Sequence, residues 1–262
     1  MSTRTGASCI RIERHGEIAI LRLARPPVNA IEGAFCRDLV AALDALEADT
    51  EVRGVILAGR PGLFSAGLDL PALLALDQAG MREFWYAFTG MFLRLWSSPL
   101  CIVAAIEGHA PAGGTVLAIA CDHRIMADGP YKMGLNEVEV GLGVPVFLCA
   151  VVRSMLGQRA AERVLTQGLL LTPLEALAVG FVDEVVAQAD VMRRAHAELA
   201  VRLARPEAAR RATKTALRRP HADAIRAGLD AEVDAFLAFW FSDDCQRELQ
   251  RVVAALAARK KA

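Results

Sequence analysis

The sequence has no excess of charge of either sign. Its 262 residues include 30 Lys and Arg and 30 Asp and Glu, so the formal net charge is zero. A protein that attracts nucleic acid or an anionic membrane surface usually carries a basic excess. The balance therefore gives no support to a nucleic-acid partner.

Paired cysteines and long apolar runs are also missing. None of the six cysteines lies in a C-x-x-C pair and most lie in apolar runs, which indicates buried, reduced thiols in a reducing compartment. No apolar run approaches the roughly 18 residues that identify a transmembrane helix. We therefore expect no membrane span.

Neither end of the chain carries a recognisable targeting segment. The start, MSTRTGASCIRIERHG, lacks the apolar core of a secretory signal. Glu13 and an early strand pattern argue against a transit peptide, and the final RKKA is not a peroxisomal address. We expect a cytoplasmic protein, or one of the mitochondrial matrix if the source is eukaryotic.

Hydrophobic periodicity predicts short strands that alternate with helices. Residues Cys9–Glu13 and Ile18–Leu23 alternate around a His-Gly turn and predict a hairpin. Apolar β-rich runs predict buried strands at Gly54–Ala58 and Cys101–Ile106, and a further strand is expected around Arg124–Ala127. Helical spacing is expected at residues 32–48, 81–95, 146–156 and 158–167.

The second half of the chain has one well-marked helix start. Thr172-Pro173-Leu174-Glu175 places Thr at the N-cap, Pro at the first helical position and Glu at the third, as in a capping box. This helix should stop at Gly180, and FVDEVV should return as a strand. From about residue 190 onward the pattern is helical and charged.

The order strand, strand, helix therefore recurs and ends in a helical tail. This order predicts a mixed α/β fold. We divide the chain into a core at residues 1–195, which holds the site, and a helical region at residues 196–262, which packs on itself or on a neighbouring subunit. With 54% hydrophobic residues, the chain can build a full core.

The stretch HAPAGGTVLAIACDHRIMADGPYKMGLNE, residues 109–137, carries the strongest chemical pattern. Gly113 and Gly114 open an apolar helix, where bare backbone N–H groups can face an oxygen that gains negative charge. Glu137 is an isolated carboxylate among apolar residues, which favours a general base with a raised pKa. Two such donors and one base suffice to move a proton next to a carbonyl group.

A second glycine-containing loop, FSAGLDL, spans Phe64–Leu70. Its small residues Ala66 and Gly67 allow a ligand to approach the backbone. Taken alone, this loop also fits a tight turn before a helix, and Gly-Gly before a helix is often only a packing feature. Because both loops follow short buried strands, Ala66 and Gly113 are expected to supply one N–H each to the same oxygen.

The motifs FSAGLDL, PAGG, CDHRIMAD and GLNEVEVGL, with the segment from Gly157 to Val186, resemble the crotonase (enoyl-CoA hydratase/isomerase) superfamily. The resemblance covers residues 10–260 and is closest to the mitochondrial-type Δ3,Δ2-enoyl-CoA isomerases. It implies a spiral of repeated ββα units with a C-terminal helical region that serves oligomerisation and pocket closure. It also implies a homotrimer or a dimer of trimers.

The resemblance also assigns roles to individual residues. It implies that the Ala66 and Gly113 N–H groups hold the thioester oxygen of an acyl-CoA, that Glu137 is the catalytic base, and that no cofactor or metal is needed beyond the coenzyme A of the substrate. Further substrate contacts are implied for these residues: Pro27, Val28, Gly67, Leu68, Asp69, Leu70 and Asn136.

Val116 separates two kinds of chemistry within this superfamily. Hydratases of the family have a second glutamate at this position, which helps to activate water, and a glycine-rich loop where this chain has Gly143-Val144-Pro145 before an apolar run. A 1,3-proton shift needs one base in a dry pocket, whereas hydration needs a polarised water. The expected function is therefore Δ3,Δ2-enoyl-CoA isomerisation in fatty acid β-oxidation. The alternatives are hydratase, thioesterase or other crotonase chemistry, and a non-catalytic acyl-CoA-binding scaffold.

Several residues have a simpler structural interpretation. Glu139 competes with Glu137 for the role of base, since both would share a face if their segment were a strand. For Asp69 the simpler alternative is a helix N-cap without a substrate contact. His109 and His123 are expected to be structural. The aromatic run from Phe84 to Phe92 is expected in the core. The basic run Arg205–Arg219 is expected to be a solvated helix face, of which one or two members could meet the CoA phosphates.

Overall fold

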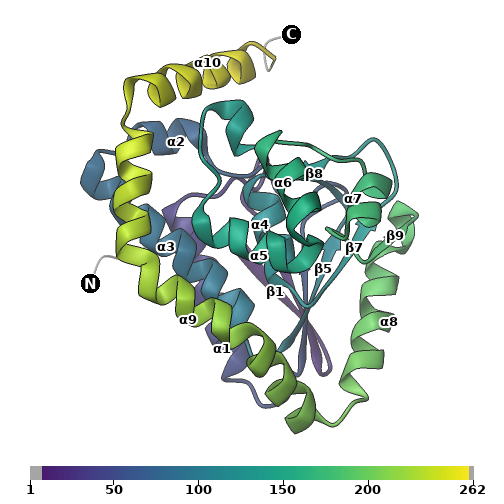
Figure 1. The fold of residues 1–262 in the computed structure, drawn as a ribbon. Helices are drawn as coiled ribbons and strands as arrows, with labels where there is room; N and C mark the ends of the chain where they lie inside the picture. Colours follow the sequence, from purple (N-terminus) through teal and green to yellow (C-terminus); the bar gives the residue numbers. More distant parts are fainter. Residues whose placement is uncertain (1–7, 260–262) are drawn as a thin grey trace.

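The computed structural model describes residues 8–259. The predictions about the start of the chain and about its RKKA end therefore fall partly outside the described residues. Within residues 8–259, no helix combines the length and the hydropathy that a membrane span requires. Strands and helices alternate through the first two thirds of the chain and give way to helices at the end (Figure 1).

A six-stranded sheet forms the centre of the fold, in the order β1-β2-β3-β5-β7-β9. β1 and β2 pair in antiparallel fashion, which confirms the predicted hairpin, and the later neighbours are parallel. β3 and β5 are buried along their whole length, as their apolar sequences require. The strands are β1 (Ile10–His15), β2 (Ile18–Leu23), β3 (Gly54–Ala58), β5 (Cys101–Ile106), β7 (His123–Ala127) and β9 (Glu184–Val186).

A second, smaller sheet continues from the carboxyl ends of the parallel strands. It consists of β4 (Gly62–Leu63), β6 (Gly108–Pro111) and β8 (Met133–Gly134), which pair in parallel in that order. The strands approach so closely that a Cβ atom on Gly108 would lie 1.9 Å from the Gly62 carbonyl carbon. The chain enters a helix soon after β4 and directly after β6, so the predicted repetition of ββα units is confirmed.

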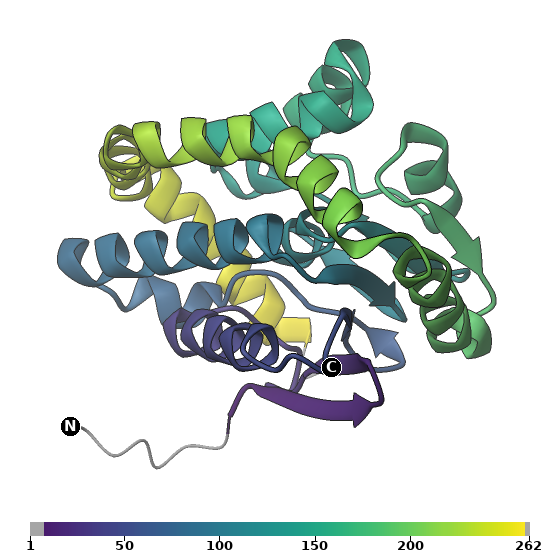
Figure 2. The ribbon, with the colours of Figure 1, turned by 90° about the horizontal axis from the view of Figure 1, so that it is seen from below.

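Helices cover both faces of the six-stranded sheet. α1 (Gly33–Glu47), α3 (Gln78–Ser97) and α4 (Gly113–Ala120) contribute to the larger core, which includes the aromatic residues of α3 as predicted. α8 (Val191–Leu203) packs on the opposite face against apolar residues of β3, β5 and β7. Figure 2 shows α1, α3 and the long α9 (Glu207–Trp240) in successive layers.

The predicted helices of the second half are confirmed with small shifts of their ends. They are α5 (Val146–Leu156), α6 (Gln158–Thr166) and α7 (Pro173–Val179). The capping box of α7 is formed by Thr172 and Glu175, and the helix ends at Gly180 in the left-handed conformation. The strand expected from FVDEVV is shorter than predicted, because only Glu184–Val186 pairs, with β7.

The chain ends in α9 and α10 (Asp243–Arg259). α9 lies along α3, where the rings of Trp85 and Phe236 stack with centroids 3.6 Å apart and Arg218 lies 4.3 Å from the ring centroid of Trp96. The predicted boundary between residues 195 and 196 falls inside α8, which packs on the sheet. The division of the chain into two domains stays a prediction.

Candidate active site

Most backbone N–H groups of the loop after β4 donate hydrogen bonds to other groups of the protein. The Ala66 N–H donates to the Val28 carbonyl oxygen at 3.0 Å, and the Ser65 N–H donates to the His109 carbonyl oxygen at 3.3 Å. A donor that already has a protein acceptor is not free to bind a substrate oxygen. The structure therefore contradicts the predicted role of the Ala66 N–H as an oxyanion donor.

The neighbouring residue, Leu68, has the free donor instead. The Gly67 N–H donates to Ser65 Oγ at 3.2 Å and the Asp69 N–H donates to the Ile31 carbonyl oxygen at 2.9 Å, whereas the Leu68 N–H has no acceptor among the described residues. Sequence reasoning placed Leu68 among the substrate contacts but missed it as a donor. No residue in the motif indicates which N–H group will donate to the Val28 carbonyl oxygen.

Leu68 and Gly113 are close because their loops touch. Gly67 has φ +88°, and a Cβ atom on it would lie 3.2 Å from the Gly113 nitrogen. A Cβ atom on Gly113 would lie 3.4 Å from the Gly67 carbonyl carbon, to which the Leu68 nitrogen is bonded. Only residues without a side chain permit this contact. It places the Leu68 and Gly113 N–H groups next to each other.

Gly113 begins α4, and its N–H has no acceptor among residues 8–259. Ala112, the preceding residue, has φ +48° and ψ −117°, a strained backbone conformation for a residue with a Cβ atom. The strained residue is held in place by its own N–H, which donates to the Gly134 carbonyl oxygen at 2.8 Å. β8 therefore fixes the direction in which α4 begins.

The turn after β2 is bonded tightly to the loop after β4. The Asn29 amide donates to the Phe64 carbonyl oxygen at 3.0 Å, and the Ser65 hydroxyl donates to the Asn29 carbonyl oxygen at 2.7 Å. Val28 lies beside Ala66, whose N–H donates to the Val28 carbonyl oxygen, and Pro27 directly precedes Val28 in this turn. Their contact with substrate stays a prediction, as do the contacts of Gly67 and Leu70.

Asp69 has two partners within the protein. One carboxylate oxygen accepts from the Ala72 N–H at 3.2 Å, so Asp69 is the N-cap of α2 (Leu70–Leu74). The other oxygen forms an ion pair with Arg25 at 2.7 Å. The N-cap interpretation is confirmed, and the predicted contact of Asp69 with substrate stays a prediction.

Glu137 begins the 3₁₀-helix η1 (Glu137–Val140), directly after Asn136. Its Oε2 atom is shielded from solvent and has no hydrogen-bond partner among the described residues. Burial raises the pKa of Glu137 to about 7. Such a carboxyl group is half ionised near neutral pH and can both accept and return a proton.

Glu139 is not equivalent to Glu137. The strand expected through this segment extends only over Met133–Gly134, so the argument that both glutamates share one face of a strand is wrong. The residue Glu139 is exposed, whereas Glu137 keeps one carboxyl oxygen out of solvent. Of this pair, only Glu137 therefore offers a carboxyl oxygen that is shielded from water.

Two further residues bear on the chemistry at the base, namely Val116 and a second carboxyl group, that of Glu232. Val116 is 1% exposed and is part of the larger core. Burial raises the pKa of Glu232 of α9, and its interaction with the backbone N–H groups of Val146 and Phe147 at the start of α5 partly offsets this rise. Sequence reasoning missed this interaction, because nothing in a long charged helix indicates which glutamate will reach another helix.

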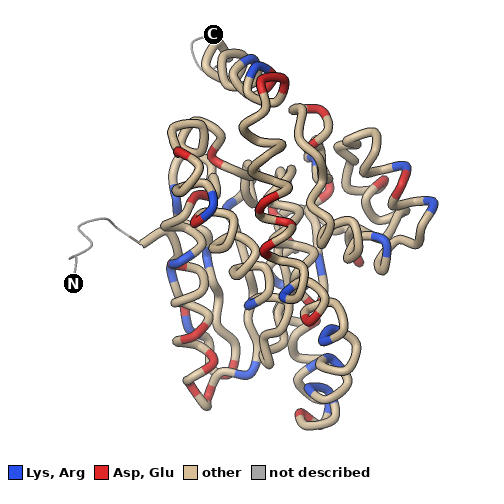
Figure 3. Tube along the Cα trace, turned by 60° about the vertical axis from the view of Figure 1, so that its left-hand side comes forward, with Lys and Arg blue, Asp and Glu red and all other residues tan. Residues whose placement is uncertain are grey.

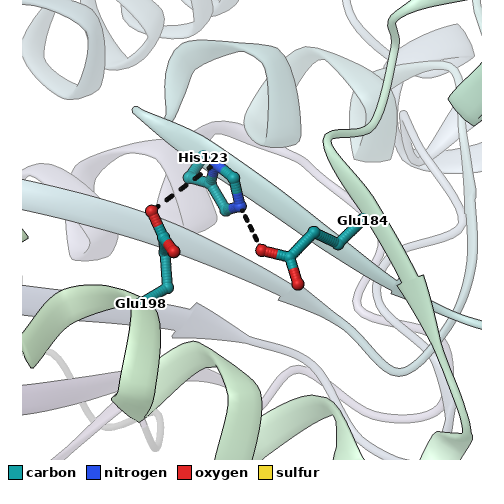
Figure 4. A group of neighbouring side chains, drawn as sticks. All are labelled: His123, Glu184 and Glu198. Atoms are coloured by element: carbon teal, nitrogen blue, oxygen red, sulfur yellow. Dashed lines mark hydrogen bonds and ion pairs between the residues drawn. The ribbon is translucent and has the colours of Figure 1, made fainter. Parts of the chain in front are cut away.

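Both histidines that were expected to be structural have protein partners. His109 Nδ1 lies 3.2 Å from the backbone nitrogen of Lys132. His123 Nε2 lies 2.9 Å from Glu184, and Figure 4 shows the imidazole between Glu184 and Glu198. These three side chains are close enough to hold a metal ion, but Arg194 forms ion pairs with both carboxylates at 2.6 and 3.1 Å. The cluster is an ion-pair network between β7, β9 and α8.

Comparison with known proteins shows the family of this chain. The model of the enoyl-CoA hydratase/isomerase family matches residues 13–257. The chain belongs to the enoyl-CoA hydratase/isomerase family. It is 41% identical over 245 residues to the human mitochondrial enoyl-CoA delta isomerase 1, an alignment that covers 93% of this chain and 81% of that protein. It is 34% identical to a putative enoyl-CoA hydratase of Thermus thermophilus, over 72% of this chain and 75% of that protein.

Solved structures of the same family share the fold. The crystal structure of human mitochondrial Δ3,Δ2-enoyl-CoA isomerase superposes with a TM-score of 0.94 at 40% identity and covers 96% of this chain and 99% of that chain. An enoyl-CoA hydratase from Bacillus halodurans superposes with a TM-score of 0.86 at 24% identity, over 93% of this chain and 100% of that chain, which shows the common fold. The predicted crotonase-like fold class is confirmed.

Proposed function

We propose that this chain is a Δ3,Δ2-enoyl-CoA isomerase, an enzyme that moves a double bond within an acyl-CoA. The observation that carries the proposal is that the carboxylate of Glu137 is shielded and unpartnered, while position 116 holds a buried valine and so supplies no second carboxylate. The similarity to the human isomerase supports the same function. The substrate is a 3-enoyl-CoA and the product is the conjugated 2-trans-enoyl-CoA.

The thioester oxygen is held by the N–H groups of Leu68 and Gly113. Both groups lack an acceptor among the described residues, and their loops are in contact. Backbone donors that are fixed before the reaction stabilise the negative charge that forms on this oxygen, and one such donor typically contributes roughly 3–4 kcal/mol. The other residues of 66–70, with Pro27, Val28 and Asn136, line the path of the CoA thioester.

Glu137 carries out both proton transfers. Its carboxylate removes a proton from C2, and the electrons of that C–H bond form a dienolate whose negative charge rests on the thioester oxygen. Glu137 then returns the proton to C4, so that the double bond moves from C3–C4 to C2–C3 and no atom is gained or lost. A pKa near 7 suits both steps, because the carboxylate is basic enough to accept the proton and the carboxylic acid is acidic enough to return it.

Hydration is the runner-up within the same family. It requires a bound water, usually polarised by two carboxylates, and Val116 provides neither charge nor hydrogen bond. An acyl-CoA-binding scaffold without catalysis is the alternative from another class. The unpartnered Glu137 carboxyl oxygen favours catalysis over this role. A buried polar atom without a partner lowers stability in any protein, and a protein that only binds has no use for it.

The decisive experiment compares Glu137→Gln with Glu139→Gln. Conversion of 3-hexenoyl-CoA is followed by the absorbance of the conjugated thioester, and added water is followed by mass spectrometry of the product. We expect the first variant to lose at least a hundredfold in kcat and the exposed control to stay within twofold. Near-normal turnover by Glu137→Gln would refute the role of Glu137. Hydrated product from the unaltered protein would favour a hydratase, and CoA-ester binding without turnover would favour a scaffold.

We extend the proposal to the assembly and the setting by analogy with the same family. The helical region at residues 196–262 closes the acyl pocket and joins subunits into a homotrimer or a dimer of trimers. The reaction needs no cofactor beyond the CoA of the substrate. The enzyme acts in fatty acid β-oxidation, in the cytoplasm or, if the source is eukaryotic, in the mitochondrial matrix.

A further inference from the structure

A basic pocket lies where α8 is followed by α9, which we call the α8–α9 pocket. Its volume is about 500 Å³, within the usual range for small-ligand sites. Figure 3 shows Lys and Arg gathered in this part of the molecule. The lining residues are Cys101, Asp122, Arg202, Arg205, Pro206, Ala209, Arg210, Thr213, Lys214, Leu217 and Arg218. Five of them are cationic and only Asp122 is anionic.

Three of the cations have partners within the protein. Lys214 and Arg218 form ion pairs with Asp122 at 2.8 and 3.1 Å, and Arg202 forms one with Glu198 at 2.7 Å. Asp122 also accepts from the Ile102 N–H at 2.7 Å, so it is fully engaged. These residues form the floor of the pocket and leave no carboxylate oxygen of the lining for the remaining cations.

Arg205 and Arg210 are the cations without partners. Neither forms an ion pair among the described residues, and Nε and Nη2 of Arg210 are shielded from solvent and have no acceptor there. A buried guanidinium donor without an acceptor is unfavourable. A phosphate group removes this cost, because its oxygens match the planar fork of arginine donors.

We propose that the α8–α9 pocket binds a small phosphate-bearing anion at a site separate from the thioester site. The pocket adjoins the amino ends of β5 and β7, at Cys101 and Asp122, whereas Leu68 and Gly113 follow the carboxyl ends of the parallel strands. β5 alone separates these ends by six residues, at about 3.3 Å per residue. None of the residues that line the pocket belongs to the loops that carry Leu68 and Gly113.

The occupant that we propose is a free phosphate-bearing anion. The nucleotide end of coenzyme A is the competing source of the same chemistry, and two titrations distinguish the two. Inorganic pyrophosphate and coenzyme A are each titrated into the full chain by calorimetry, with ionic strength held constant by KCl. We expect saturable pyrophosphate binding that persists when the thioester site is filled with butyryl-CoA. Binding of pyrophosphate to the folded protein should also raise Tm, by an amount that increases with the pyrophosphate concentration.

Variants locate the site. Arg210→Gln should weaken pyrophosphate binding at least tenfold and Arg205→Gln severalfold. The control variant Arg226→Gln, on the same helix α9 and outside the pocket, should change the affinity for pyrophosphate less than twofold. If Arg210→Gln fails to fold, Arg210→Lys replaces it, because this variant keeps the charge and loses the forked donors. Arg205 is exposed, so its substitution should leave the fold intact.

Three results would overturn the proposal. The first is the absence of any pyrophosphate effect beyond that of matched ionic strength. The second is binding that the Arg210 and Arg205 variants leave unchanged, which would place the anion elsewhere. The third is binding of coenzyme A alone that these variants weaken, which would assign the pocket to the coenzyme. None of these readouts depends on turnover, so failure here leaves the isomerase proposal untouched.

Discussion

Gly67 and Gly113 are in direct backbone contact. A Cβ atom on Gly113 would lie 3.3 Å from Gly67 Cα and 2.8 Å from Ile31 Cδ1, and the contact sets the spacing of the two free N–H groups, those of Leu68 and Gly113. Neither donor is a side chain. The geometry of the proposed oxyanion site therefore depends on how closely two loops approach each other.

Substitution of Gly113 by Ala should impair catalysis far more than folding. The added methyl group pushes the two loops apart and misaligns both donors, so we expect kcat for 3-hexenoyl-CoA to fall about a hundredfold, in the range seen when one oxyanion donor is lost. The control is Gly90→Ala, on α3, where a Cβ atom would meet nothing within 4 Å. Equal kcat in the two variants would argue against Gly113 as a donor.

The rate should depend on the ionisation of Glu137. Because burial raises its pKa to about 7, the carboxylate is present above that pH and is protonated below it. We expect kcat/KM to be constant above about pH 8 and to fall tenfold per pH unit below about pH 6. A profile measured from pH 5 to 9 that stays flat to pH 5 would contradict a base with a raised pKa.

Glu137 should also make the folded state less stable at alkaline pH. A carboxyl group with a raised pKa in the folded state favours folding fully below its unfolded pKa, near 4.5, and this contribution is lost as pH rises through about 7. Glu137→Gln removes the ionisable group. We expect this variant to exceed the unaltered protein in free energy of unfolding at pH 8 by on the order of 1–3 kcal/mol.

Urea denaturation at pH 8 and at pH 4.5 measures this difference, which should disappear at the lower pH. Glu139→Gln provides the comparison, since this residue is exposed. A Glu137→Gln variant that is less stable than the unaltered protein at pH 8 would show that the carboxylate has a stabilising partner.

Local features of the fold were accessible from the sequence. The capping box at Thr172 and Glu175 involves residues three positions apart, and the chemistry of the helix start decides it without help from the rest of the chain. The buried strands β3 and β5 were equally predictable. A short apolar run of five or six residues is typical of a parallel strand that is buried on both faces.

Features that depend on distant contacts were not accessible. The choice between the Ala66 and Leu68 N–H groups is made by the carbonyl oxygens of Val28 and Ile31, which belong to a turn after β2. Likewise, the basic run of α9 was expected to be a solvated face. Packing against Asp122 and Cys101 shields part of it, and no periodicity within the helix indicates this.

α9 connects two regions that are far apart along its axis. Arg210 lies near its beginning and Phe236, which stacks on Trp85, lies near its end. At about 1.5 Å per residue, its 34 residues extend over roughly 50 Å. Pro220 removes one backbone hydrogen bond between them, so bending concentrates there. A displacement at one end of α9 is therefore transmitted to the other end, and Pro220 is the position at which the helix bends most easily.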